Sequence, residues 1–296
     1  MSNDKNSEYT LAELMIVASA REIKDGELVF AGVGNPTLGA LLAQTTHAPS
    51  AMIATESGSI GPQPRRVMLG IGDNAGIENA VISTSLWRLF ADQQRGFVDI
   101  GMVGGAQVDR YGNLNSTVIF GEGSYQVPAS RLPGSGGAND IASCAQRTVI
   151  SIPLQKRRFL ERVDFITSPG YLTGGTAREK AGLPGGGPSA IITDKCIFRF
   201  HPESKEIMLE SVHPGVTVED VKAEISWELL TVENVQTTQP PSAEEVAMIR
   251  RLDAGGIYTG TGLKNLTFDG YIEMLESSLE LLGDLLKVNR QDKEIF

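Results

Sequence analysis

Short apolar runs that end in glycine-rich segments constrain the fold of this chain more than any other feature. These runs occupy residues 28–31, 51–54, 98–103, 148–152, 163–167, 189–193 and 196–200. A continuous apolar run bounded by turn residues is typical of a strand buried inside an α/β sheet. Because helical patterns separate the earlier runs, we expect an α/β fold with a mainly parallel sheet flanked by helices and an antiparallel portion towards the C-terminus.

One of these runs leads into Glu56. Residues 51–62 read AMIATESGSIGP, so the apolar run ends at Thr55 and Glu56 before a sharp break of serine and glycine. In α/β sheets the carboxyl ends of strands are where ligands bind. No lysine or arginine occurs within eight positions of Glu56 on either side. Glu56 is therefore a candidate to meet a ligand, although a helix cap or a solvent-facing position would suit the same residue.

Charge and cysteine usage exclude several classes of protein. The 296 residues carry a formal net charge of −10, so neither nucleic acid nor an anionic membrane is expected as a partner. Two cysteines outside any CxxC pattern and three scattered histidines predict neither a disulfide framework nor a metal site. The polar N-terminus and the lack of a membrane-length apolar run favour a cytoplasmic enzyme. An anionic substrate would need a local basic patch, for which residues 65–66 and 156–158 are candidates.

A second glycine cluster occurs in residues 133–143, which read PGSGGANDIAS and precede a predicted helix start. The backbone amides of Gly136, Gly137 and Ala138 would point together at that helix N-terminus, where the helix dipole favours negative charge. This is the geometry of an oxyanion hole. A flexible turn would have the same composition, so the residues alone leave both interpretations open.

Helices are predicted from capping residues and apolar spacing. Capping pairs occur at residues 10 and 13, 217 and 220, and 242 and 245. A helix is also expected over residues 77–94, with Trp87, Leu89 and Phe90 in the core. Between the run 28–31 and a helix over residues 37–44, the GVGNP turn of residues 32–36 is similar to a phosphate-binding turn. It lacks the lysine of a P-loop and the third glycine of the dinucleotide fingerprint, so it is a weak nucleotide motif.

Several blocks in this order and spacing resemble the β subunits of family I CoA-transferases, and most of all the glutaconate CoA-transferase group. The blocks are ATESGSIGP, IGMVGGAQVDRYGNLNST, PGSGGANDIAS, KRRF with FITSPGY, and GLPGGGPSAIITDK. Because several glycine-patterned blocks agree together, the resemblance does not depend on any one of them. It implies a CoA-transferase-like fold of the NagB/RpiA-like type, formed by residues 1–254.

The resemblance implies roles for particular residues. Glu56, in the ESG block, corresponds to the family's catalytic nucleophile, and the amides of Gly137 and Ala138, in the GSGGA block, correspond to its oxyanion hole. The two residues follow Glu56 by 81 and 82 positions, which agrees with the family pattern. Contacts to the CoA thioester, which is the substrate rather than a tightly bound cofactor, are expected from four further residues: Gly104, Gly105, Ala106 and Gly136.

The resemblance also implies a partner, a homologous α subunit in a hetero-oligomer of α2β2 or larger composition. Residues 255–296 do not match the family. They predict a C-terminal extension with an amphipathic helix over residues 271–288, a pattern typical of a docking surface. The expected reaction is transfer of CoA between carboxylic acids, with dicarboxylic acids as one option and no metal involved.

Two other classes of function stay open at this point. Proteins of the same fold include CoA-thioester hydrolases that open steroid rings and a decarboxylase of an acyl-CoA. These depart from the glutamate block, which is intact here, but residues 212–221 (VHPGVTVEDV) are closer to the steroid-ring hydrolase. The chain could instead be a non-catalytic subunit that stabilises an active one, a role that the C-terminal extension would suit.

Overall fold

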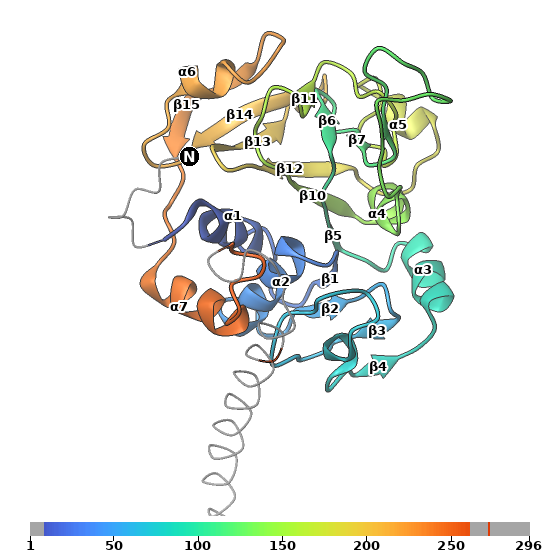
Figure 1. Cartoon of the computed structure of the whole chain (residues 1–296), viewed down its shortest axis with the longest axis vertical. Coiled ribbons are helices and arrows are strands. Elements are labelled where there is room, and N and C mark those ends of the chain that lie inside the picture. The colour runs from blue at the N-terminus through green and yellow to red at the C-terminus, as the bar shows by residue number, and fades with distance from the viewer. Residues whose placement is uncertain (1–8, 261–271, 273–296) are drawn as a thin grey trace, which may run out of the picture.

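The computed structural model describes residues 9–260 and residue 272 (Figure 1). The helices are α1 (Leu11–Ala20), α2 (Asn35–Thr45), α3 (Leu86–Gln94), α4 (Ala138–Cys144), α5 (Ala177–Lys180), α6 (Val218–Lys222), α7 (Ala243–Leu252) and the 3₁₀ helix η1 (Asn74–Ile77). The strands of the large sheet are β1 (Leu28–Ala31), β2 (Met52–Ala54), β3 (Ser59–Ile60), β4 (Ile82–Ser83), β5 (Ile100–Val103), β10 (Arg147–Ser151), β12 (Pro188–Ile192), β13 (Cys196–Phe200), β14 (Ile207–Val212) and β15 (Leu230–Thr237). The strands of two small sheets are β6 (Gln107–Asp109), β7 (Leu114–Asn115), β11 (Phe159–Leu160), β8 (Val118–Ile119) and β9 (Ser130–Arg131).

The large sheet has ten strands, in the order β15-β14-β13-β12-β10-β5-β1-β2-β3-β4. Its five central strands, β12 to β2 in that order, all pair in parallel. Antiparallel pairs flank them, β2 with β3 and β3 with β4 on one side, and β12 with β13 and β13 with β14 on the other. The predicted mainly parallel α/β sheet with an antiparallel portion is confirmed.

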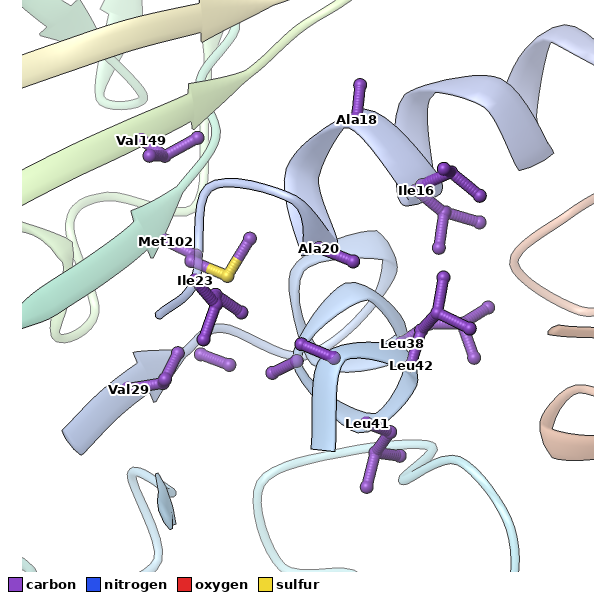
Figure 2. Close-up of a cluster of buried hydrophobic side chains, with 14 of the residues drawn as sticks. Ile16, Ala18, Ala20, Ile23, Val29, Leu38, Leu41, Leu42, Met102 and Val149 are labelled. Atoms are coloured by element: carbon purple, nitrogen blue, oxygen red, sulfur yellow. The ribbon is translucent and has the colours of Figure 1, made fainter. Parts of the chain in front are cut away.

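The central strands are buried on both faces, because alternate side chains enter two separate cores. In β1, Val29 and Ala31 join one core and Phe30 joins the other. Figure 2 shows the first core, in which Leu38 and Leu42 of α2 pack beside Ile16 of α1. Helix α7 adds Ile249 and Leu252 to this core. The second core brings α3 and α4 to the opposite face through Leu89 and Ile141.

The predicted helix starts are confirmed by their hydrogen bonds. Thr10, Thr217 and Ser242 each accept from the backbone amide three residues later, and each receives the reciprocal carboxylate contact of a capping box. These bonds satisfy amides that have no partner within the helix.

The prediction of one helix over residues 77–94 is wrong in its first half. Residues 82–83 form strand β4, which pairs with β3, and α3 begins only after Ser85. β-Branched Val81, Ile82 and Thr84 favour an extended backbone. Trp87 is 70 % exposed, whereas Leu89 is 2 % exposed and lies in the core as predicted. Residues two positions apart in a helix, such as Trp87 and Leu89, differ by about 200° around its axis. Because Leu89 faces the core, Trp87 lies on the outer face.

Two other regions also differ from expectation. Residues 163–167 form no strand; instead Ser168 makes a single bridge with Leu114. The hairpin of β13 and β14 is as predicted, but the sequence did not predict β15, a half-exposed strand parallel to β14.

Beyond residue 254, Tyr258 packs against the first core and donates to the Met68 carbonyl. The predicted helix over residues 271–288 lies outside the described residues.

Candidate active site

Glu56 is the second residue of a tight turn at the carboxyl end of β2. The Gly58 amide donates to the Thr55 carbonyl at 2.9 Å, which closes the turn. Gly58 has φ of +100°, and a β-carbon built on it would lie 2.2 Å from the Thr84 carbonyl oxygen. Only glycine fits both the conformation and the space. The glycine therefore fixes the sharpness of the turn that presents Glu56.

Buried hydroxyl groups brace this turn from within. Thr55 Oγ1 lies 2.7 Å from Ser57 Oγ and 2.5 Å from Ser59 Oγ. Ser59 Oγ in turn donates to the Gly76 carbonyl. Because both Thr55 and Ser59 are buried, these bonds are shielded from water and hold the turn in one conformation.

The Glu56 carboxylate lies against the second glycine cluster. A β-carbon built on Gly137 would be 3.1 Å from Glu56 Oε1, and one built on Gly136 would be 3.5 Å from the same atom. Within the described part of the chain the half-buried carboxylate makes no hydrogen bond or ion pair. The structure thus brings together Glu56 and Gly137, which are 81 residues apart in the sequence.

Phe90 of α3 closes the other side of Gly137. A β-carbon on Gly137 would lie 2.6 Å from Phe90 Cζ, well inside van der Waals contact. The Phe90 ring packs on Phe30 of β1, with ring centroids 5.6 Å apart. Gly137 is therefore confined between an aromatic ring and a carboxylate, and any larger residue would displace one of them. The sequence contains no signal for this wall, because the contact depends on how α3 and α4 pack.

The amides of Gly137 and Ala138 differ in availability. Gly137 caps α4, and its N–H donates to no atom of the described residues. The Ala138 amide donates to the Ser135 carbonyl at 2.9 Å. An amide without a partner at a helix N-terminus is the one that is ready to bind an anion.

Gly104, Gly105 and Ala106 follow β5 at the same edge of the sheet as Glu56. Strand β1 lies between β5 and β2, so the two segments are about two strand spacings, roughly 10 Å, apart. Gly104 is exposed, whereas the Ala106 amide donates to the Asn115 carbonyl at 2.9 Å. The structure thus places these residues at the same sheet edge as Glu56, with one strand between the two segments.

The turn of residues 32–36 is partly covered: Gly34 is buried, although Val33 is exposed. A β-carbon built on Gly34 would lie 3.8 Å from the Tyr258 ring, and Thr37 Oγ1 donates to the Gly32 carbonyl. The Tyr258 segment is itself held by Asp253, which accepts three backbone amides, those of residues 257, 258 and 259. This arrangement gives the weak nucleotide motif a packing role.

The two basic patches named from the sequence have different environments. Arg65 pairs with Glu78 at 3.0 Å, and Arg66 pairs with Asp73 at 2.6 Å. Burial alone would raise the pKa of Asp73, but hydrogen bonds from Arg66 and from two backbone amides outweigh it and lower this pKa to about 2. Both arginines are thus engaged within the protein.

Arg157 and Arg158, by contrast, share a neutral partner. Each donates from Nε to Gln155 Oε1, at 2.9 and 3.2 Å, and neither forms an ion pair or hydrogen bond with a carboxylate among the described residues. The charge of Asp194 nevertheless acts on Arg158 and favours its charged form. Burial and the charge of Arg157 lower the pKa of Arg158. The loop that carries them follows β10, so it lies at the same edge of the sheet as Glu56.

Within the described ranges, residues 9–260 and 272, no three histidine, cysteine, aspartate or glutamate side chains gather in a way that would hold a metal ion. None of the helices described is long and apolar enough to cross a membrane.

Comparison with known proteins places these features in a family context. The family model described as Coenzyme A transferase matches residues 12–224. The chain is 42 % identical over 251 residues to a subunit of 3-oxoadipate CoA-transferase from Pseudomonas knackmussii, covering 84 % of this chain and 95 % of the relative. It is 35 % identical over 253 residues to the corresponding subunit of glutaconate CoA-transferase from Acidaminococcus fermentans, covering 83 % and 94 %.

Structural comparison agrees. The crystal structure of glutaconate coenzyme A-transferase from Acidaminococcus fermentans superposes with a TM-score of 0.79 at 34 % identity, covering 85 % of this chain and 97 % of the other. A more distant similarity, 27 % over 246 residues, links the chain to the cholesterol ring-cleaving hydrolase IpdB subunit of Mycobacterium tuberculosis, covering 81 % and 93 %.

Proposed function

This chain belongs to the coenzyme A transferase family, and we propose that it transfers CoA between carboxylic acids through a glutamyl-CoA thioester on Glu56. The observation that carries the proposal is the position of the Glu56 carboxylate. It stands on a braced turn, lacks a partner among the described residues, and lies against Gly137, whose amide is also unpartnered there. A nucleophile beside an unused amide donor is the pair that acyl transfer requires.

The first half of the reaction attaches CoA to the protein. A glutamate carboxylate is ionised at neutral pH and needs no general base, so a Glu56 oxygen attacks the thioester carbonyl directly. A carbon–oxygen bond forms and the carbon–sulfur bond breaks, so CoA leaves as the thiolate and the acyl group stays on Glu56 as a mixed anhydride. The thiolate then attacks the Glu56 carbonyl carbon, which releases the donor acid as its carboxylate and leaves CoA on Glu56 as a thioester.

The second half reverses these steps with another acid. The incoming carboxylate attacks the carbonyl carbon of the Glu56 thioester and displaces the CoA thiolate. The acceptor acid and Glu56 are then joined as a new mixed anhydride. The thiolate then attacks the acyl carbon of the acceptor and restores the Glu56 carboxylate. No ATP is consumed, because the thioester bond energy is retained throughout.

Each attack develops negative charge on a carbonyl oxygen, and the Gly137 amide is the donor placed to receive it. The Ala138 amide can contribute only as a shared donor, or after it releases the Ser135 carbonyl. Loss of one such donor typically costs on the order of 10²–10³ in rate. Phe90 adds an apolar wall, which strengthens these electrostatic interactions by excluding water.

The substrate class that fits is dicarboxylic acyl-CoAs, because the names of two relatives above 30 % identity contain the dicarboxylates 3-oxoadipate and glutaconate. CoA itself is a polyanion. Arg157 and Arg158 suit its phosphates better than Arg65 and Arg66, which are neutralised by carboxylates. The pantetheine arm of the CoA thioester is proposed to run along this sheet edge, in contact with Gly104, Gly105, Ala106 and Gly136.

A homologous α subunit is the proposed partner. Each of these two relatives is named as one subunit of its enzyme, and the alignment covers 95 % and 94 % of their lengths, which supports a role for this chain as one subunit beside another. The assembly is expected to be an α2β2 complex or larger.

The test is an assay of the complex isolated with its partner subunit. We would supply a dicarboxylic acyl-CoA with and without a second carboxylic acid, and follow both the new acyl-CoA and free CoA thiol. Transfer that depends on the acceptor, with little thiol released, is expected. Release of thiol or of carbon dioxide without an acceptor would contradict the proposal and favour the hydrolase or decarboxylase alternative.

A further inference from the structure

The loop that carries Gly136 and Gly137 has little conformational preference of its own. Gly134 has φ of +100° and Gly136 has φ of +48°, both in the region that favours glycine. A β-carbon on Gly134 would meet no atom within 4 Å, so packing does not fix this residue. Packing against Phe90 and the bond from the Ile141 amide hold Gly137 itself. Because glycine-rich segments have high backbone entropy, the segment that leads into Gly137 needs a further anchor.

Ser116 supplies that anchor through two reciprocal hydrogen bonds. Ser116 Oγ donates to the Gly134 carbonyl at 2.8 Å, and the Gly134 amide donates to the Ser116 carbonyl at 2.8 Å. The next backbone bond between these two segments joins the Leu132 amide to the Thr117 carbonyl, at 2.9 Å. Among the described residues, Ser116 is the only one whose side chain forms a hydrogen bond with residues 133–137.

Ser116 is itself held by a buried threonine. Thr167 Oγ1 accepts the Ser116 amide at 2.9 Å and lies 2.7 Å from Thr117 Oγ1. The Thr167 amide donates to the Leu114 carbonyl of β7 at 2.8 Å, and Thr167 is buried. A continuous chain of hydrogen bonds thus links the small sheet of β6, β7 and β11 to the glycine loop.

We propose that Ser116 is a positioning residue for the reaction: through Gly134, it holds the Gly137 amide at the distance from Glu56 that a developing oxyanion requires. The inference rests on the proposed function. An oxyanion donor must lie within about 2.7–3.1 Å of the oxygen, and misplacement of about 1 Å can cost roughly 10²-fold in rate. Ser116 forms no hydrogen bond with Glu56, so its proposed effect on the rate passes through the loop.

The test is a steady-state comparison of variants within the isolated complex. Ser116→Ala removes the hydroxyl but keeps the backbone bond from Gly134. We expect kcat to fall by roughly 10-fold, while KM for the CoA thioester and Tm stay close to those of the unmodified complex. Ser116→Thr restores a hydroxyl and is expected to recover most of kcat. Ser50→Ala is the matched control, because Ser50 is exposed, its side chain makes no hydrogen bond with the described residues, and it precedes β2, at the opposite end of that strand from Glu56.

The outcomes separate the two proposals. If the unmodified complex transfers CoA and Ser116→Ala has the same kcat, the positioning role is wrong and the proposed function stands. If Ser116→Ala lowers kcat and Tm and raises KM together, and Ser116→Thr does not recover kcat, Ser116 has only a structural role and the inference fails. If the unmodified complex transfers no CoA from any thioester tested, the proposed function fails and the positioning role fails with it.

Discussion

Two turns meet at the candidate site, and they are held in different ways. The turn of residues 55–58, which presents Glu56, is braced by hydroxyl groups of Thr55, Ser57 and Ser59, all within four positions of one another. The loop of residues 134–137 is held from Ser116, eighteen positions earlier. The first turn has hydroxyl groups that brace it from within, in addition to the Ser59 bond to the Gly76 carbonyl. In the second, the only side-chain hydrogen bond among the described residues comes from Ser116, outside the loop.

Because of this difference, each half of the site should respond to substitutions in different parts of the chain. Changes near the Glu56 turn act through local geometry that the neighbouring sequence encodes. Changes to the glycine loop act through α3, α4 and the small sheet, which bring Phe90 and Ser116 into place. Substitutions should therefore separate the chemistry of the nucleophile from the placement of the donor.

The largest expected effect comes from removing the nucleophile. Glu56→Gln keeps the shape of the side chain but cannot form a CoA thioester by direct attack. We expect the transfer rate to fall by at least about 10⁴-fold with Tm unchanged, because the carboxylate has no partner among the described residues to lose. Glu122→Gln, at an exposed site, is the control for the loss of one charge. A Glu56→Gln complex with near-normal transfer would remove Glu56 from the mechanism.

The next effect comes from crowding the donor. Gly137→Ala places a methyl group 2.6 Å from Phe90 Cζ and 3.1 Å from Glu56 Oε1. We expect kcat to fall by roughly 10- to 100-fold, since the methyl group displaces the donor or the nucleophile by a fraction of an ångström to about 1 Å. Overpacking of this kind also typically costs about 1–3 kcal/mol of unfolding free energy. Phe90→Leu in the same chain should relieve part of the loss, which a double-mutant cycle measures. Gly70→Ala, where a β-carbon meets nothing within 4 Å, should be nearly neutral.

A smaller effect on transfer is expected from a change in the Glu56 turn itself. Gly58→Ala combines a strained φ with a β-carbon 2.2 Å from the Thr84 carbonyl oxygen. We expect a loss of about 2–4 kcal/mol in the free energy of unfolding, measured by urea denaturation, together with reduced transfer. An unchanged unfolding free energy would mean that the turn yields easily and does not fix Glu56.

The smallest effect is pH-dependent and concerns Asp73, which caps η1 and so places the Gly76 carbonyl that Ser59 binds. Its pKa of about 2 in the folded chain lies below the ordinary value of 3.8. The carboxylate therefore contributes stability above about pH 4, and this contribution is lost as the pH falls towards 2. Asp73→Asn should cost about 2 kcal/mol of unfolding free energy at pH 7, a difference that shrinks on acidification. A difference that is constant with pH would contradict this account.

Much of the sheet could be predicted from the sequence, because its central strands are continuous apolar runs. The runs at 28–31 and 196–200 coincide with β1 and β13. Short or half-exposed strands such as β4 and β15 could not be predicted, since their residues are stabilised by pairing with neighbours rather than by local pattern. Trp87 could not lie in the core beside Leu89, because residues two positions apart in a helix face nearly opposite sides of it.

The candidate site was predictable in part. The strand end and the glycine break single out Glu56, and the second cluster singles out Gly137. Their approach to each other, the wall formed by Phe90 and the anchor at Ser116 depend on contacts between distant segments, which spacing alone does not encode. The pairing of Arg65 and Arg66 with nearby carboxylates was equally hidden, because it is set by the fold of residues 61–78.

The most direct test of the account is to trap the CoA thioester on Glu56. The complex with its partner subunit would be incubated with an acyl-CoA and no acceptor, reduced with borohydride, and digested for mass spectrometry. The account predicts a Glu56 side chain reduced to the alcohol, only in samples that received acyl-CoA. An unmodified Glu56 in a sample that hydrolyses, decarboxylates or ring-opens the same acyl-CoA would contradict it.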